Sequence, residues 1–158
     1  METRIIPPPL KLDLQSAFLL MPIYSGNHGK ITEIFKNVNN YLCLKEFGDR
    51  ETADIFAELI VLGASHIIEI DRIIYRLGIT PFLPEIHFSI SKRKPLSPEK
   101  VLSDAIVFTL SEICFQEKVV SKIKDKDVKE SLLKVVSQEK EKVDILKARL
   151  NFIKTKHA

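Results

Sequence analysis

The chain has 158 residues, of which 45% are hydrophobic and 28% are charged, and its formal net charge is +3. This length is sufficient for one domain with a sizeable core, and this composition excludes an intrinsically disordered protein. Five glycines and eight prolines are too few for the many turns of a β-sandwich, so the composition favours a helical protein.

The location of the protein in the cell is indicated by signals that the sequence lacks. Cys43 and Cys114 have neither the spacing of metal ligands nor that of a disulfide framework, which fits a reducing compartment. The N-terminus lacks the regions of a signal peptide, and charged residues interrupt each apolar run well short of a membrane span. We therefore expect a cytoplasmic protein with no membrane partner.

Lysines are frequent in the last part of the chain, from Glu117 onward. A basic helix can bind nucleic acid or an acidic partner. Here, however, the lysines alternate with acidic residues, and no aromatic or clustered basic face accompanies them. The pattern therefore favours a solvated helix face and disfavours nucleic-acid binding.

Residues 1–21 are expected to form an extended N-terminal arm, because the three prolines from Pro7 to Pro9 cannot be helical. At the end of this arm, the apolar residues 14–21 can form a short helical turn that stops before Pro22. This apolar surface exceeds what one bundle needs to close its core. We therefore expect a homodimer in which the arm covers a neighbouring subunit.

Residues 22–158 are predicted to form a bundle of four helices. The first helix spans residues 22–47. Asp49 can cap the second helix, which spans residues 50–77 and is closed by a glycine. The positions expected to face inward are Ile23, Lys30, Ile34, Val38 and Tyr41 in the first helix, and Phe56, Gly63, His66, Ile67, Ile70, Ile74 and Leu77 in the second.

A proline-rich stretch, residues 79–96, separates the second helix from the third, and the alternation in residues 86–90 is typical of a strand. Fully extended, this stretch could reach about 60 Å, which exceeds the length of a helix of about 40 Å. The Ser-Pro-Glu motif at residues 97–99 predicts the start of the third helix, which runs to about residue 124. Its expected inward positions are Leu102, Ile106, Thr109, Ile113, Gln116, Val120 and Ile123.

The fourth helix carries a charged residue among its apolar inward positions. Asp127 and Glu130 are predicted to form a capping box at its start. The inward positions are Leu132, Val136, Glu139, Val143, Leu146, Leu150 and Ile153. An ionised carboxylate that faces a core must find a partner or take up a proton, so Glu139 predicts polar partners on other helices. Alternatively, Glu139 leans outward from the edge of its stripe.

These elements predict an all-α four-helix bundle with one long crossover. Short connections make the first and second helices antiparallel neighbours, and likewise the third and fourth. The long connection between the second and third helices allows the second pair to enter the bundle in a crossover arrangement.

Four short stretches resemble known proteins in their order and spacing. They are Tyr24-Ser25-Gly26 with Lys30-Ile31-Thr32, Ala64-Ser65-His66 with Leu77-Gly78, residues 123–127, and Glu139-Lys140-Glu141-Lys142. On these stretches the chain resembles the ferritin-like superfamily, and within it the bacterial rubrerythrin-like and manganese-catalase-like proteins. The resemblance implies a ferritin-like bundle.

The resemblance also implies where a metal centre would lie. Such proteins bind two metal ions through carboxylates and imidazoles from four helices. The positions that match the ligands are Lys30, Gly63, His66, Thr109, Glu139 and Lys142. Only His66 and Glu139 keep a ligand residue, and the two lysines would repel a divalent cation. We therefore expect a structural or interaction protein with no cofactor and no catalytic residues, rather than an enzyme.

Two alternatives remain open. In one, the chain is a metal-dependent oxidoreductase that handles peroxide or oxygen at a mononuclear iron or manganese site. Its ligands would be His66 and Glu139, and either Glu33 or Glu112 would complete the set. In the other, His66 is a hydrogen-bonded core histidine and no ligand at all.

The sequence also predicts what replaces the metal. An unpaired buried carboxylate at Glu139 would cost on the order of several kcal/mol. Lys30 comes from another helix, so its ammonium is expected within hydrogen-bonding reach of Glu139, with His66 close by. Lys142 is expected nearer the edge of its stripe, where it can reach water.

The register of the third helix is a separate prediction. Thr109 is expected beside His66 and Glu139. Glu112 lies about one turn further along. Finding it there instead, with Thr109 pointing to solvent, would show that this register is wrong by about a turn.

Overall fold

The computed structural model describes residues 12–81 and 96–156. In chain order the helices are α1 (Leu14–Ser25), α2 (Lys30–Phe47), α3 (Arg50–Arg76), α4 (Pro98–Lys122) and α5 (Lys126–Lys156). No strand occurs in the described residues, so the prediction of an all-α protein is confirmed. The strand-like pattern of residues 86–90 lies outside them. Among the described helices, none combines the length and the hydropathy that crossing a membrane requires.

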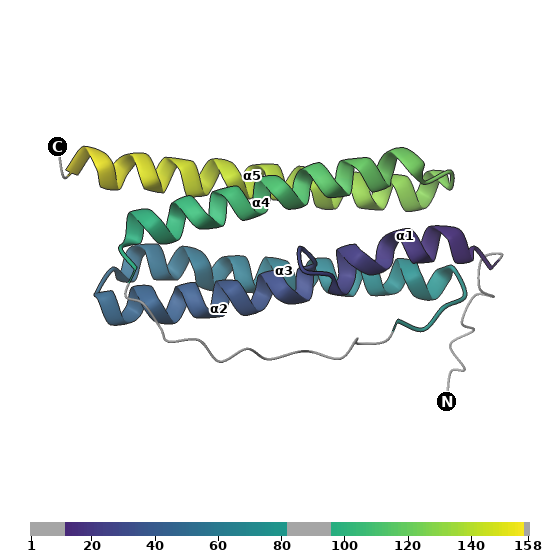
Figure 1. Ribbon diagram of the computed structural model, residues 1–158, viewed down its shortest axis with the longest axis horizontal. Coiled ribbons are helices and arrows are strands. Elements are labelled where there is room, and N and C mark those ends of the chain that lie inside the picture. The colour runs from purple at the N-terminus through teal and green to yellow at the C-terminus, as the bar shows by residue number, and fades with distance from the viewer. Residues whose placement is uncertain (1–11, 82–95, 157–158) are drawn as a thin grey trace, which may run out of the picture.

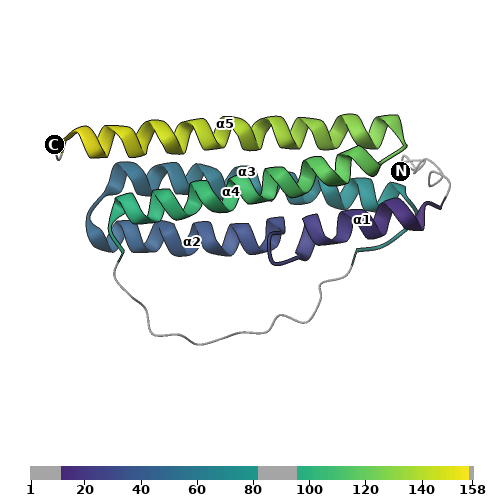
Figure 2. The ribbon, with the colours of Figure 1, turned by 45° about the horizontal axis from the view of Figure 1, so that its top comes forward.

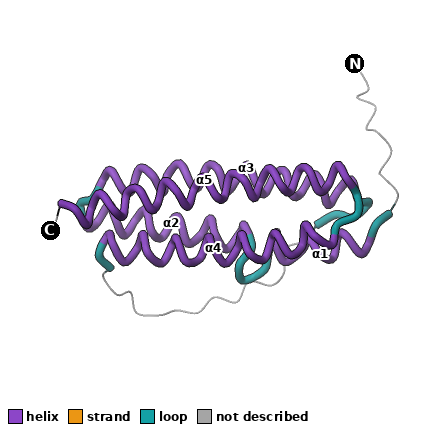
Figure 3. The backbone as a smooth tube through the Cα atoms, turned by 90° about the horizontal axis from the view of Figure 1, so that it is seen from above, coloured by secondary structure: helices purple, strands orange, loops and turns teal. Residues whose placement is uncertain are grey.

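The helices are arranged as two hairpins. α2 packs on α3, and α4 packs on α5. Figure 1 shows the α4–α5 pair lying over the α2–α3 pair, with α1 extending along the bundle beyond the start of α2. α4 begins at the end of the bundle where α3 begins, so these two helices run in the same direction (Figures 1 and 2). Figure 3 shows from above that all five helices share one long axis.

Several predicted helix ends are confirmed. At the start of α3, Asp49 Oδ1 accepts a hydrogen bond from Thr52 N at 3.1 Å. At the start of α4, Ser97 Oγ accepts one from Lys100 N at 3.3 Å. Gly48 closes α2 with a φ of 91°, a conformation that glycine adopts at little cost.

The first predicted helix is broken into two. Instead of one helix over residues 22–47, α1 ends at Ser25 and α2 begins at Lys30. At the break, Gly26 is extended, and a Cβ atom there would lie 2.5 Å from the carbonyl oxygen of Pro22, so a larger residue would require a shift. Pro22 itself lies inside α1 and does not mark a helix start.

The apolar end of the predicted N-terminal arm is helical, as expected, but this helix does not stop before Pro22. Residues 1–11 lie outside the described residues, but residues 14–21 belong to α1. Ala17, Leu20 and Ile23 are buried in a hydrophobic cluster with side chains of α3, α4 and α5 of the same chain. These side chains complete the core of their own subunit, so they provide no argument for a dimer.

The start of α5 also differs from the prediction. α5 begins at Lys126, and Val128 N donates to Asp125 Oδ1 at 2.9 Å. Asp125, rather than Asp127, therefore occupies the capping position. Both residues precede the same apolar stripe, so their spacing alone does not distinguish them.

A layer of polar residues divides the apolar core into two parts. One hydrophobic cluster lies toward the α2–α3 turn and includes Phe56 and Leu146. The other lies toward the opposite end and includes Leu20 and Ile74. Between them, α2, α3, α4 and α5 each bury charged or polar side chains. The two apolar clusters thus hold this layer in the middle of the bundle, away from solvent.

Candidate functional site

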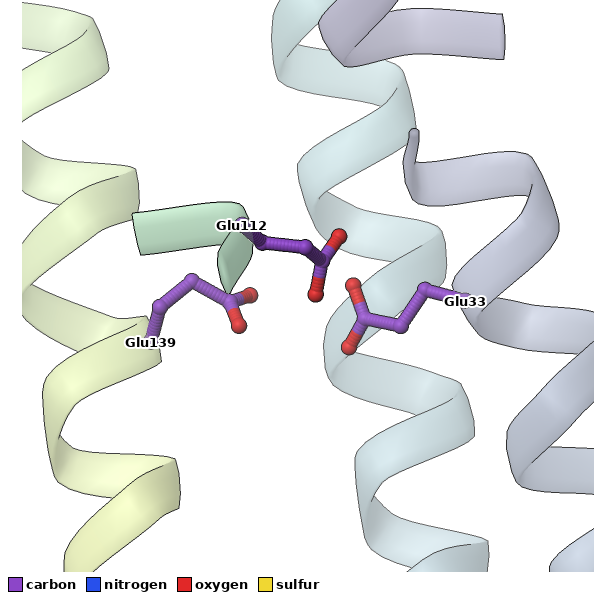
Figure 4. Close-up of side chains that lie close together, drawn as sticks. All are labelled: Glu33, Glu112 and Glu139. Carbon is purple, nitrogen blue, oxygen red and sulfur yellow. The ribbon is translucent and has the colours of Figure 1, made fainter. Parts of the chain in front are cut away.

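Six ionisable side chains meet in the polar layer, and we call them the buried ionic cluster. Each of these residues is at most 2% exposed. The members are Lys30 and Glu33 of α2, His66 of α3, Glu112 of α4, and Glu139 and Lys142 of α5. Figure 4 shows the three carboxyl groups pointing toward one another from different helices.

Lys30 lies at the centre of the cluster. Its Nζ lies 2.7 Å from Glu139 Oε1 and 2.7 Å from Glu33 Oε2. A longer contact of 3.4 Å joins it to Glu112 Oε1. The prediction that Lys30 crosses the core to reach Glu139 is therefore confirmed, and the alternative that Glu139 leans outward is wrong.

Lys142 is a second cation inside the cluster. The expectation that it reaches water is wrong, because it is 2% exposed. Its Nζ lies 2.6 Å from Glu139 Oε2 and also pairs with Glu33. Glu33 on α2 faces α5 closely enough to draw this side chain inward, and the sequence of α5 alone does not reveal that partner.

His66 is held at both ring nitrogens. Its Nδ1 lies 2.9 Å from Glu139 Oε1, as predicted, and its Nε2 lies 2.9 Å from the side-chain amide of Gln138. Both partners belong to α5, so the imidazole links α3 to α5. This geometry agrees with a hydrogen-bonded core histidine.

The α4 member of the cluster is Glu112 rather than Thr109, although the predicted inward face of this helix is confirmed. Thr109 is also buried, but its hydroxyl donates to the carbonyl oxygen of Ala105 at 2.9 Å. The two residues are one turn apart on the same inward face. Of the two, the longer side chain of Glu112 reaches Lys30, at 3.4 Å.

Gly63 allows α2 and α3 to approach closely beside the cluster. A Cβ atom at this position would lie 2.9 Å from Cγ1 of Ile34. A larger residue would therefore have to displace the Ile34 side chain. The position contributes space to the packing and no polar group.

Burial and neighbouring charges shift the pKa values in the cluster in opposite directions. Burial, with a further contribution from the Glu33 carboxylate, raises the pKa of Glu112 to about 9. Burial would also raise the pKa of Glu139, but a hydrogen bond from His66 and the two ammonium groups hold it well below its usual value. Burial disfavours the charged form of Lys30, yet Glu33 and the other carboxylates outweigh it and raise its pKa.

Groups of opposite charge are paired within the cluster. The raised pKa of Glu112 favours its protonated form, while Glu33 and Glu139 each contact both Lys30 and Lys142. A buried charge without compensation is strongly destabilising. The pairing therefore explains how six ionisable groups can be buried together.

A small pocket between α2 and α4 reaches the cluster. Its volume is about 160 Å³, and its walls include Glu33, Lys142 and Thr109. This is less than the usual volume of a pocket for a drug-sized ligand. The pocket has room for a few water molecules or for a molecule of similar size.

The cluster contains the oxygen ligands of a metal site, but it does not fit a divalent ion as it stands. Glu33, Glu112 and Glu139 each offer an oxygen, and these atoms lie within 4.8 Å of one another. Hard cations prefer such carboxylate oxygens. However, Lys30 Nζ contacts all three carboxyl groups and Lys142 Nζ contacts two of them. The ammonium groups thus take the place that a cation would need.

The inward face of α2 differs from the one that apolar periodicity predicts. The buried residues of this helix are Lys30, Glu33, Asn37 and Leu44. The predicted positions Ile34, Val38 and Tyr41 are only partly buried. These buried positions repeat at helical spacing, which is a signal in the sequence. Three of the four residues are polar, so a pattern of apolar residues alone does not reveal it.

The comparisons with known proteins do not identify a family. No family model matches this sequence, and no curated protein matches it significantly. The buried ionic cluster is therefore the basis for a proposed function.

Proposed function

We propose that this chain is a ferritin-like bundle, of the bacterial rubrerythrin-like and manganese-catalase-like kind, that has lost its di-metal centre. In this proposal it is a non-catalytic structural or interaction protein of the cytoplasm, and it needs no cofactor. The observation that carries the proposal is the position of Lys30 and Lys142 among the three carboxyl groups.

The arrangement of the helices supports the ferritin-like assignment. Two hairpins pack on each other, and α3 and α4 run in the same direction, as a long crossover between them would require (Figure 1). The four long helices contribute ionisable side chains at one level near the middle of the bundle. A metal centre of this superfamily would be built at such a level.

The charges of the cluster support the loss of the metal. Two ammonium groups supply the charge of one divalent ion, and they do so through short contacts of 2.6 and 2.7 Å to Glu139. Each lysine is covalently part of the chain, so no ion has to be acquired for the bundle to close. The lysines thereby replace the structural role of a metal and remove its Lewis acidity and redox chemistry.

Elemental analysis tests this proposal. Protein purified without chelators should contain far less than one iron, manganese or zinc ion per chain, because Lys30 and Lys142 repel divalent cations. Stoichiometric iron or manganese would contradict the proposal. Glu139→Gln is a suitable second sample, since a metal bound at the cluster should be lost from it, whereas metal bound elsewhere on the surface should remain.

The alternative function is a metal-dependent oxidoreductase that handles peroxide or oxygen at a mononuclear site. The observation in its favour is that Glu33, Glu112 and Glu139 offer oxygens within 4.8 Å of one another, with His66 bound to the last of them. The pocket that reaches Glu33 is large enough for such small molecules. This alternative requires Lys30 and Lys142 to lose their protons or swing away, which makes it the weaker of the two.

A further inference from the structure

The outer face of α3 carries an apolar stripe that no other described element covers. Val61, Ile68 and Tyr75 are 71%, 70% and 54% exposed. They are spaced by seven residues, so they lie on one side of the helix. The small residues Ala64 and Ser65 are exposed between them. A stripe of this kind is typical of a helix that packs against another helix.

Exposed charged residues also lie beside the stripe. Among them are Asp54 and Glu58 in the first half of α3, and Arg72 and Arg76 in its second half. Arg72 binds Glu69 at 2.6 Å, but its side chain is still 65% exposed. Because a helix turns by about 100° per residue, all four of these residues lie near the same exposed side as Val61 and Ile68.

The positions of these residues match a two-fold axis. Asp54 and Arg76 have their midpoint at residue 65, and so do Glu58 and Arg72. If two copies of α3 lie antiparallel with the axis at Ser65, each acidic residue meets an arginine of the other copy. Along the helix, this axis brings Val61 of one copy level with residue 69 of the other, next to Ile68.

We propose that the outer face of α3 is the interface of a homodimer, in which two copies pack antiparallel about a two-fold axis at Ser65. A two-fold interface is self-complementary, so each attractive contact occurs twice. The small side chains at the axis allow the two backbones to approach closely. The paired stretch, from Asp54 to Arg76, is about 33 Å long.

This proposal is distinct from the expectation that residues 14–21 form a dimer, and it deepens only the interaction part of the proposed function. A metal found in the buried ionic cluster would contradict the proposed function and leave this interface unaffected. A monomeric protein would contradict the interface and leave the loss of the metal unaffected.

The sharpest test uses two variants with opposite charge reversals, Glu58→Arg and Arg72→Glu. In either variant alone, both Glu58–Arg72 pairs of the dimer become repulsive, so self-association should weaken by about tenfold or more. When the two variants are mixed, each new arginine meets a new glutamate, and each original glutamate meets an original arginine. A heterodimer should therefore form, and sedimentation velocity should detect it.

A second comparison tests the apolar part of the interface. Ile68→Lys should convert the dimer to a monomer at concentrations of tens of micromolar. Val107→Lys is the matched control, because Val107 is 67% exposed on α4, away from the proposed interface, and this variant should remain dimeric. A wild-type monomer at such concentrations would overturn the proposal. So would a dimer that is insensitive to Ile68→Lys, or variants that do not associate when mixed.

Discussion

Lys30→Met should lower the free energy of unfolding by about 3 to 5 kcal/mol. The substitution keeps most of the volume of the side chain, so the effect is chiefly the loss of a buried charge. Lys30 Nζ contacts Glu33, Glu112 and Glu139, and Lys142 alone would then face two carboxylates. Urea denaturation followed by circular dichroism measures the change.

A second substitution separates the lost charge from lost packing. In Lys30→Met with Glu139→Leu, one positive and one negative group are removed together, and Lys142 remains paired with Glu33. Much of the lost stability should therefore return. Lys134→Met, at an exposed position of α5, is the control and should have little effect. If Lys30→Met is as stable as the parent protein, Lys30 does not compensate the carboxylates of the cluster.

The stability of the protein should fall as the pH rises from about 6 to 8.5, and Glu112→Gln should remove much of this dependence. The pKa of Glu112 is raised from 4.5 to about 9 in the folded chain. Between these two values the unfolded chain has released the proton and the folded chain has kept it. The unfolded state binds fewer protons, so the free energy of unfolding decreases with pH, by at most about 1.4 kcal/mol per pH unit.

The chosen pH range isolates Glu112 from the other shifted groups. The lowered pKa of Glu139 contributes stability that is lost only in acid, below its unfolded value of 4.5. The raised pKa of Lys30 contributes stability that is lost only above its unfolded value of 10.5. Glutamine mimics the protonated carboxyl of Glu112, whereas Glu141→Gln on the surface should keep the parental pH profile. Parallel profiles for the parent and Glu112→Gln would contradict a protonated Glu112.

The inward faces of α4 and α5 could be predicted from the sequence because most of their members are apolar. All seven positions predicted for α4 are buried. In α5, six of the seven are buried, and Leu150 is partly buried. Glu139 interrupts an otherwise aliphatic stripe, and the need to compensate its charge predicts its contact with Lys30.

The remaining errors arise where polar residues or a backbone break control the structure. On α2 the inward face begins with Lys30, Glu33 and Asn37. Apolar periodicity therefore predicts that the adjacent side of the helix faces inward. The position of Lys142 near the edge of its stripe predicts contact with water, but Glu33 on another helix pairs with it in the core. The break at Gly26 depends on a close backbone approach to Pro22, which a residue pattern does not reveal.

We propose that Lys30 and Lys142, and not a metal ion, hold the carboxyl groups of the bundle together. The most direct test of this claim is the melting temperature of the protein after exhaustive dialysis against a chelator, measured alone and with excess Mn²⁺ or Fe²⁺. A ligand of the folded state present at a hundredfold excess over its Kd would add about 2.7 kcal/mol. We predict the same melting temperature in all samples. A melting temperature that falls on chelation and returns with either metal would contradict the claim.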